Sequence, residues 1–221
     1  MNSIKKILIK KDRSCKSIWF MRQAGRYLPE FKKIRLKNQN FINLCLDSDL
    51  VTEITLQPIK RFDLDSAIIF SDILIVPHAL GQDVNFTKNY GPVLSKFNLN
   101  KFLQNDSSSF TKKLEPIYKA INKTRKKLDD KKSLISFIGA PWTLFYYMSN
   151  KKENLNTFIK EYSEKEIDLI FEKLNYFLCL HIKNQIDAGA DVIQIFDSWA
   201  GLLKKRNLKK FCFLPNKKLV E

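Results

Sequence analysis

The chain has 221 residues, of which 44% are hydrophobic and 12% aromatic, and it carries a formal net charge of +16. This composition excludes a disordered protein, and the length allows one domain with a sizeable core. No apolar run approaches the roughly 18 residues of a membrane span, and the apolar part of the first ten residues is too short for a signal peptide. We therefore predict a cytoplasmic protein with no membrane partner.

The positive charge is spread over the whole chain. It comes from 32 lysines and only 7 arginines. Many of the lysines form adjacent pairs, such as Lys5-Lys6, Lys112-Lys113 and Lys217-Lys218. No pattern of stacking aromatic residues accompanies them, as a nucleic-acid-binding surface would require. We predict that these lysines lie on solvated faces and that nucleic acid is not a partner.

The cysteines and histidines do not form a recognisable metal motif. Cys15, Cys45, Cys179 and Cys212 are scattered without CxxC spacing, which favours free thiols. His181 follows Cys179 by two residues within a predicted helix, a spacing at which the two side chains do not face one site. We predict that His181 packs structurally and that the protein holds no metal.

The first predicted element is a strand near residues 16–21, which ends at a turn that carries two arginines. The stretch IWFMRQAGRYLPEF (residues 18–31) places Arg22 and Arg26 four residues apart, with Gly25 between them. The planar guanidinium group matches a carboxylate or phosphate with two hydrogen bonds. Surface ion pairs are the alternative for such arginines. Ligand contacts at strand ends are typical of parallel α/β folds, and this position favours a binding role.

The next elements are a helix and a buried strand. Ser48 or Asp49 can cap a helix that continues through residue 59, with Pro58 expected to kink or shorten it. The apolar run at residues 67–70 suits a strand buried on both faces, and it ends at Ser71-Asp72. The carboxylate of Asp72 is therefore either a helix cap or a buried site group.

The second half of the chain repeats this alternation. Residues 77–109 show no periodicity and are predicted to be loops, and a helix follows at 110–128. A strand at 134–138 ends in Gly139. A helix at 163–188 is stopped by Gly189, and a last strand at 191–196 ends in Asp197-Ser198-Trp199.

Strands that alternate with helices predict a parallel sheet with right-handed crossovers. Polar or glycine-containing turns at the strand ends are typical of a (β/α)₈ TIM-type barrel. Because neither a GxGxxG nor a Walker sequence is present, a nucleotide-binding doubly wound sheet is the weaker alternative. We predict an α/β barrel represented by about its first four βα units.

Four segments carry a resemblance to a known family. RQAGRYLPE (22–30), FSDIL (70–74), GAPWTL (139–144) and QIFDSWAG (194–201) are similar, in this order, to segments of the uroporphyrinogen decarboxylase family. ITLQPIKRFDLD and AIIFSDILIVPHALG also match the family pattern. The resemblance covers nearly the whole chain.

The resemblance implies an enzyme that converts uroporphyrinogen III to coproporphyrinogen III in porphyrin and haem biosynthesis, as a cytosolic homodimer that needs no cofactor. It implies that Arg22 and Arg26 meet substrate carboxylates and that Asp72 accepts hydrogen bonds from the pyrrole N–H groups. Tyr147 would contact a substrate acetate, and Ser198 would bind a carboxylate side chain. Asp72, Arg22 and Arg26 are the predicted catalytic residues.

The family pattern continues beyond the segments found here and includes a histidine on a late strand. We therefore expect residues 1–221 to be a single, incomplete barrel domain, which alone would be loosely packed and inactive. The alternatives are an inactive fragment, a non-catalytic porphyrin-binding protein of the same fold, or a zinc-dependent corrinoid-type methyltransferase. The methyltransferase needs a His and Cys zinc site, for which His78 and His181 have no convincing third ligand.

Overall fold

The computed structural model describes residues 3–12, 14, 16–23, 27–87, 91–149 and 162–221. The described residues form two compact units. Unit 1 contains the described parts of Met1–Asp72, Leu114–Phe137 and Lys183–Gln194, and unit 2 those of Ile73–Lys113, Ile138–Ile182 and Ile195–Glu221. The chain therefore passes between the units several times, and long elements such as the helix at 164–187 contribute to both.

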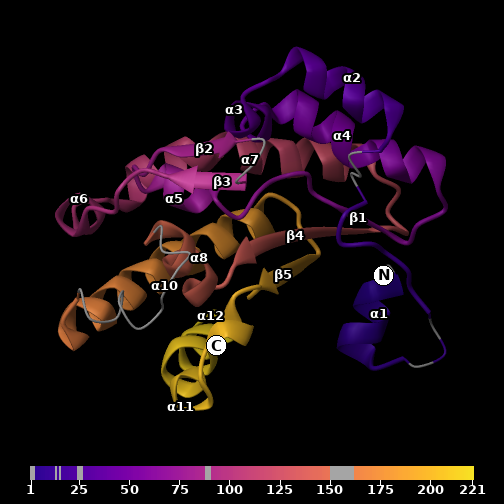
Figure 1. Cartoon of the computed structure of the whole chain (residues 1–221). Helices are drawn as coiled ribbons and strands as arrows, with labels where there is room; N and C mark the ends of the chain where they lie inside the picture. Colours follow the sequence, from indigo (N-terminus) through magenta and orange to yellow (C-terminus); the bar gives the residue numbers. More distant parts are fainter. Residues whose placement is uncertain (1–2, 13, 15, 24–26, 88–90, 150–161) are drawn as a thin grey trace. The chain divides into compact units, whose positions relative to one another are not determined.

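Figure 1 shows the helices and strands in chain order. The α-helices are α1 (Ser3–Lys10), α2 (Pro29–Lys37), α3 (Phe41–Cys45), α4 (Ser48–Arg61), α5 (Ile75–Ala79), α6 (Leu99–Leu103), α7 (Ser107–Lys127), α8 (Pro141–Met148), α10 (Glu164–Asp187), α11 (Lys205–Leu208) and α12 (Leu214–Val220). The strands are β1 (Ser66–Ile68), β2 (Val84–Thr87), β3 (Gly91–Leu94), β4 (Ser133–Gly139) and β5 (Val192–Phe196). A short 3₁₀ helix, η1 (Ala200–Leu202), and a π-helical turn, η2 (Lys209–Phe213), complete the C-terminal part.

The larger sheet has the strand order β1-β4-β5. β1 and β4 are parallel, with Ser66 opposite Ser133 and Ile68 opposite Ile135. All three residues of β1 are buried, and β4 is buried at all but one position, as expected for strands that are covered on both faces. β5 is an edge strand of this sheet and is half-buried along its whole length. The predicted α/β class with a parallel sheet is confirmed.

The strands predicted at 67–70, 134–138 and 191–196 are confirmed as β1, β4 and β5, but the strand predicted near 16–21 is wrong. Residues 16–20 belong to no regular element, and residues 21 and 22 form a turn. The amide of Ile18 donates to Oδ2 of Asp65 at 2.7 Å, and the amide of Asp65 donates to the Ile18 carbonyl at 3.1 Å. Because a side chain takes the place of a second backbone partner, no regular strand ladder forms.

The helix predicted from Ser48 is confirmed as α4, but its cap is Asp47. Oδ1 of Asp47 accepts the amides of Asp49 and Leu50, each at 3.0 Å, and so satisfies two of the donors that a helix start leaves without a partner. Pro58 lies in the last turn, and the helix ends three residues later at Arg61. α4 thus continues past Pro58 and beyond the predicted end at residue 59.

Helices α7 and α10 are confirmed at the predicted positions, with Gly189 after the end of α10. Gly189 has φ +112°, a conformation that favours glycine, and its amide donates to the Ile186 carbonyl at 2.9 Å. The prediction of loops over residues 77–109 is wrong for much of this range, which contains the end of α5, strands β2 and β3, helix α6 and the start of α7. β2 and β3, which are labelled in Figure 1, form an antiparallel pair. In this pair Val84 lies opposite Leu94.

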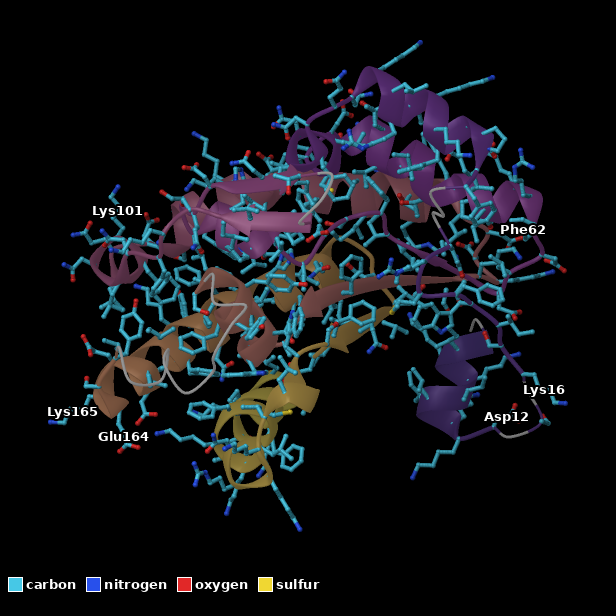
Figure 2. All side chains as sticks on the ribbon, viewed as in Figure 1. Asp12, Lys16, Phe62, Lys101, Glu164 and Lys165 are labelled. Atoms are coloured by element: carbon cyan, nitrogen blue, oxygen red, sulfur yellow. The ribbon has the colours of Figure 1, made fainter. Side chains whose placement is uncertain are left out.

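The lysines that Figure 2 labels are exposed, as the sequence predicted. Lys16, Lys101 and Lys165 are exposed residues.

Among the helices that the structure describes, none is both long and apolar enough to span a membrane.

An ion cluster in unit 1 joins residues that are far apart in the sequence. Asp191 accepts from Nζ of Lys5 at 2.5 Å, from Nη1 of Arg125 at 3.0 Å and from the amide of Leu134 at 2.9 Å. Burial, the largest influence, raises the pKa of Asp191, but the hydrogen bonds from Lys5 and Leu134 and the charges of Lys5 and Arg125 outweigh it. The pKa of Asp191 is therefore lowered from its usual value.

We expect Asp191→Asn to lower the free energy of unfolding of the full-length protein by about 2 kcal/mol at pH 7, the scale of hydrogen bonds to a charged group. Because the folded pKa is lowered, this stabilisation is present above the unfolded pKa of about 3.9 and is lost as the pH falls through the folded value. Urea unfolding at pH 7 and pH 3 tests both statements. Asp130→Asn is the control, since Asp130 also faces Arg125 (at 3.8 Å) but its side chain is fully exposed. Equal losses in the two variants would contradict the prediction.

Candidate functional site

The turn that carries Arg22 is anchored to the start of β1. The side chain of Gln23, which is only 4% exposed, accepts the amide of Phe20 at 2.8 Å through Oε1 and donates to the Ser66 carbonyl at 2.9 Å through Nε2. The Gln23 amide also donates to the Phe20 carbonyl at 3.1 Å. Arg22 itself is exposed on this turn, where its fixed charge can meet an anion. Arg26 lies outside the described residues.

Asp72 follows the other end of β1 and is half-buried. The residues before it are held tightly: the Ile69 amide donates to the Ile135 carbonyl, and the Phe70 amide donates to Oγ1 of Thr55, both at 2.9 Å. The ring of Phe70 packs edge-on against Phe31 and Phe41, with centroid distances of 5.7 and 5.8 Å. Asp72 therefore follows a segment that is held in place by hydrogen bonds and ring contacts. A preorganised charge requires such an attachment.

The carboxylate of Asp72 acts on its surroundings in unit 1. Cys45 is buried, and burial followed by the charge of Asp72 raises the pKa of its thiol well above the usual value, while Arg35 opposes this effect. Asp72 is not the N-cap of α5, which is Leu74. Asp72 therefore does not cap α5, and its role as a site group stays a prediction.

Tyr147 belongs to α8 of unit 2, which begins directly after β4. Gly139 ends β4, and a Cβ atom there would lie 2.7 Å from Cδ2 of Leu144, so a larger residue would require the Leu144 side chain to shift. Pro141 starts the helix at the position where proline is favoured. Tyr147 is half-buried and makes edge-on contacts with the rings of Tyr146 at 6.3 Å and Trp199 at 5.8 Å.

Ser198 is exposed in the turn that follows β5. Its neighbour Trp199 stacks on Tyr146 with a centroid distance of 4.5 Å and an angle of 28°. The indole of Trp142 donates to the Trp199 carbonyl at 3.0 Å. The turn that carries Ser198 is therefore packed against the helix that carries Tyr147.

The structure brings some of the predicted residues close to one another within a unit. In unit 2, Tyr147 contacts the residue next to Ser198. In unit 1, the Arg22 turn is attached beside Ser66 at the start of β1, whereas Asp72 follows the opposite end of the strand. The gathering of Arg22 with Asp72 at the carboxyl ends of the strands stays a prediction.

Several residues that support these side chains were not singled out from the sequence. Gln23 lies inside the arginine motif, and Thr143 and Asp197 lie inside the GAPWTL and QIFDSWAG segments. Oγ1 of Thr143 donates to Oδ1 of Asp197 at 2.7 Å and accepts the Trp199 amide at 3.1 Å. Gln23 and Asp197 each adjoin a predicted site residue, which was an available signal, whereas Thr143 adjoins none.

His181 and Cys179 on α10 differ in exposure, since His181 is buried and Cys179 is exposed. His181 is 1% exposed and meets Phe110 edge-on at 6.3 Å, and burial lowers its pKa to about 3. Cys179 is exposed. Cys45, Cys179 and Cys212 are free thiols, and Cys15 lies outside the described residues. Across the part of the chain that the structure describes, no three His, Cys, Asp or Glu side chains are grouped to hold a metal ion.

A solved methyltransferase from Methanosarcina mazei shares the fold. The match has a TM-score of 0.67 at 17% identity and covers 85% of this chain and 57% of that protein. At this level of identity the likeness concerns the fold alone.

Curated relatives are much more similar in sequence. The uroporphyrinogen decarboxylases of Rickettsia bellii (strain RML369-C) and Rickettsia felis (strain ATCC VR-1525 / URRWXCal2) are each 46% identical over 211 and 208 residues, respectively, which is 92% of this chain. The aligned part is 61% and 60% of their own lengths, so the chain spans about three fifths of these relatives. The family model described as "Uroporphyrinogen decarboxylase (URO-D)" matches residues 3–221. The chain belongs to the uroporphyrinogen decarboxylase family.

Proposed function

We propose that the protein that carries this chain removes the four acetate carboxyl groups of uroporphyrinogen and yields coproporphyrinogen in porphyrin biosynthesis. The observation that carries the proposal is the family match over residues 3–221, together with 46% identity to proteins named uroporphyrinogen decarboxylase. The half-buried, rigidly attached Asp72 supports it further, because it supplies a fixed negative charge.

The proposed chemistry starts with protonation of a pyrrole carbon. Loss of an acetate carboxyl group leaves an electron pair that needs an acceptor, which a cofactor supplies in many enzymes. A protonated pyrrole ring can accept this pair itself, so the reaction as proposed uses no cofactor. Asp72 would accept hydrogen bonds from the pyrrole N–H groups and stabilise the positive charge that develops in the ring.

The other predicted residues would bind the carboxylates of the substrate. Arg22 and Arg26 would hold them with their two-pronged guanidinium groups. The hydroxyl groups of Tyr147 and Ser198 would donate to an acetate and to a second carboxylate. Since a guanidinium group stays protonated at any working pH, positioning of the substrate is a better role for Arg22 and Arg26 than donation of the proton.

We also propose that the sheet continues beyond β5. β5 is half-buried and lies at the edge of the sheet, so a further parallel strand beside it would extend the sheet toward a (β/α)₈ barrel. In this arrangement the chain supplies the first βα units of the barrel. We also propose that the complete protein acts as a cytoplasmic homodimer, as the sequence resemblance implies.

Anaerobic incubation of the full-length protein with uroporphyrinogen tests the proposed activity. Mass spectrometry should detect species that have lost one to four carboxyl groups in succession and then coproporphyrinogen. Metal content is measured on the same sample. Tight binding of the tetrapyrrole without loss of carboxyl groups would instead indicate a non-catalytic binding protein, and dependence on bound zinc would point to methyltransferase-type chemistry.

A further inference from the structure

The carboxylate of Asp197 is the centre of a hydrogen-bond network within unit 2. Its Oδ1 accepts from Oγ1 of Thr143 at 2.7 Å. Its Oδ2 accepts from Sγ of Cys212 at 3.1 Å and from Nδ2 of Asn216 at 3.2 Å. Both carboxylate oxygens are therefore engaged by groups of the protein, one on α8, one on the π-helical turn η2 and one on helix α12.

Thr143, Cys212 and Asn216 all donate hydrogen bonds to the Asp197 carboxylate. An ionised carboxylate has acceptor sites alone, whereas an amide would turn an NH₂ group toward one set of these donors. A negative charge in contact with a polycarboxylate substrate would also repel it. Both carboxylate oxygens of Asp197 already have partners within the protein. Asp197 is therefore better suited to hold the site in place than to contact the substrate.

Thr143 transmits this support to the turn that carries Ser198. Its side chain is completely buried, and the hydroxyl that donates to Asp197 also accepts the Trp199 amide at 3.1 Å. The Trp142 indole donates to the Trp199 carbonyl at 3.0 Å. The peptide groups on both sides of Trp199 are thus fixed to α8, immediately after Ser198.

The same turn is coupled to Tyr147 through ring contacts. Trp199 stacks on Tyr146 and meets Tyr147 edge-on at 5.8 Å. Loss of the Thr143 contact would therefore move the Ser198 backbone together with the Trp199 ring that contacts Tyr147.

We propose that Asp197 and Thr143 are positioning residues, which hold Ser198 and Tyr147 as a preformed pair for a substrate carboxylate. This inference rests on the proposed function, since it assigns the support of two residues that we propose to touch the substrate. Preorganisation of this kind lowers the ordering cost of binding, so loss of the support acts mainly on substrate affinity.

Two substitutions of Thr143 give a matched test in the full-length protein. Thr143→Val keeps the shape but removes the hydroxyl, whereas Thr143→Ser keeps the hydroxyl. We expect Thr143→Val to raise KM for uroporphyrinogen about tenfold with a smaller effect on kcat, the loss of one well-placed hydrogen-bonding group. Thr143→Ser should restore KM to near the wild-type value. Equal KM values for the two variants would overturn the inference.

A double-mutant cycle with Ser198→Ala separates support of Ser198 from a general structural role. If Thr143 acts through Ser198, Thr143→Val should raise KM less than about threefold further in the Ser198→Ala background. Fully additive effects, with KM already raised in Ser198→Ala, would overturn the inference and leave the proposed role of Ser198 intact. An unchanged KM in Ser198→Ala would overturn both.

The network also has a readout that does not depend on turnover. Burial, followed by the hydrogen bond to Asp197 and the charge of Asp197, raises the pKa of the Cys212 thiol to about 11. Asp197→Asn removes that charge, so alkylation of Cys212 at pH 8 should become several-fold faster, because the thiolate is the reactive form. Peptide mass spectrometry follows Cys212 with the exposed Cys179 as internal reference. An unchanged Cys212 rate, relative to Cys179, would overturn the network at Asp197.

Discussion

Replacement of Asp72 by asparagine in the full-length protein is expected to lower the turnover of uroporphyrinogen by at least about a hundredfold, the scale of one lost preorganised partner. The amide keeps the shape of the side chain but cannot supply the negative charge that would face the protonated pyrrole. Turnover is measured under anaerobic conditions from the rate at which coproporphyrinogen appears. Substrate affinity should change much less than kcat, because the charge develops only in the transition state.

Asp63→Asn is the matched control for this experiment. Asp63 also lies in unit 1, but its side chain is fully exposed and its contact is with Lys132 at 3.0 Å. We expect normal turnover in that variant, since exposed ion pairs contribute little. Near-normal turnover of Asp72→Asn, with Asp63→Asn unchanged, would remove Asp72 from the proposed mechanism.

Arg22→Lys is expected to have the second largest effect. Lysine keeps the positive charge but loses the planar fork that binds a carboxylate with two hydrogen bonds. We expect kcat/KM for uroporphyrinogen to fall about tenfold or more, on the scale of hydrogen bonds to a charged group. Initial rates at low substrate concentration measure this quantity directly.

Arg206→Lys is the appropriate control, because Arg206 is exposed on α11 and lies outside the four resemblance segments. Arg35 is less suitable. Its guanidinium group donates to the carbonyls of Asn38 and Gln39 after α2 and lies 5.7 Å from the centre of the Phe41 ring, so its replacement would also remove contacts that hold the end of α2. An equal fall in kcat/KM for Arg22→Lys and Arg206→Lys would argue against a substrate contact at Arg22.

The elements that were correctly predicted from the sequence are those whose apolar pattern is continuous. The runs at 67–70 and 134–138 are buried on both faces in β1 and β4, and burial is what such a run predicts. Helix α10 ends where Gly189 adopts a positive φ. In each case a local signal and the packing agree.

The predictions failed where a side chain from a distant residue decides the local structure. The apolar run at 16–21 reads as a strand, yet Asp65 and Gln23 provide the bonds that a neighbouring strand would have supplied. Exposure of Ile18 at 57% and Phe20 at 61% shows that this run is not a core element. Periodicity carries no information about such long-range polar contacts.

In the candidate site, too, local sequence patterns located some residues, while others depend on contacts between distant parts of the chain. Asp72 could be located from its place after a buried strand, whereas the support that Thr143 gives to the Trp199 turn depends on residues 56 positions apart in the sequence. Motif resemblance identified the segments that contain both residues. It could not distinguish a residue that would touch the substrate from one that holds its neighbour in place.

The yield of carbon dioxide per molecule of uroporphyrinogen, measured on metal-stripped full-length protein, tests the central claim most directly. The account predicts a yield that approaches four, with coproporphyrinogen as the final product and with full activity retained after chelation. Substrate that is bound but releases no carbon dioxide, or activity that returns only when a metal ion is added, would contradict it.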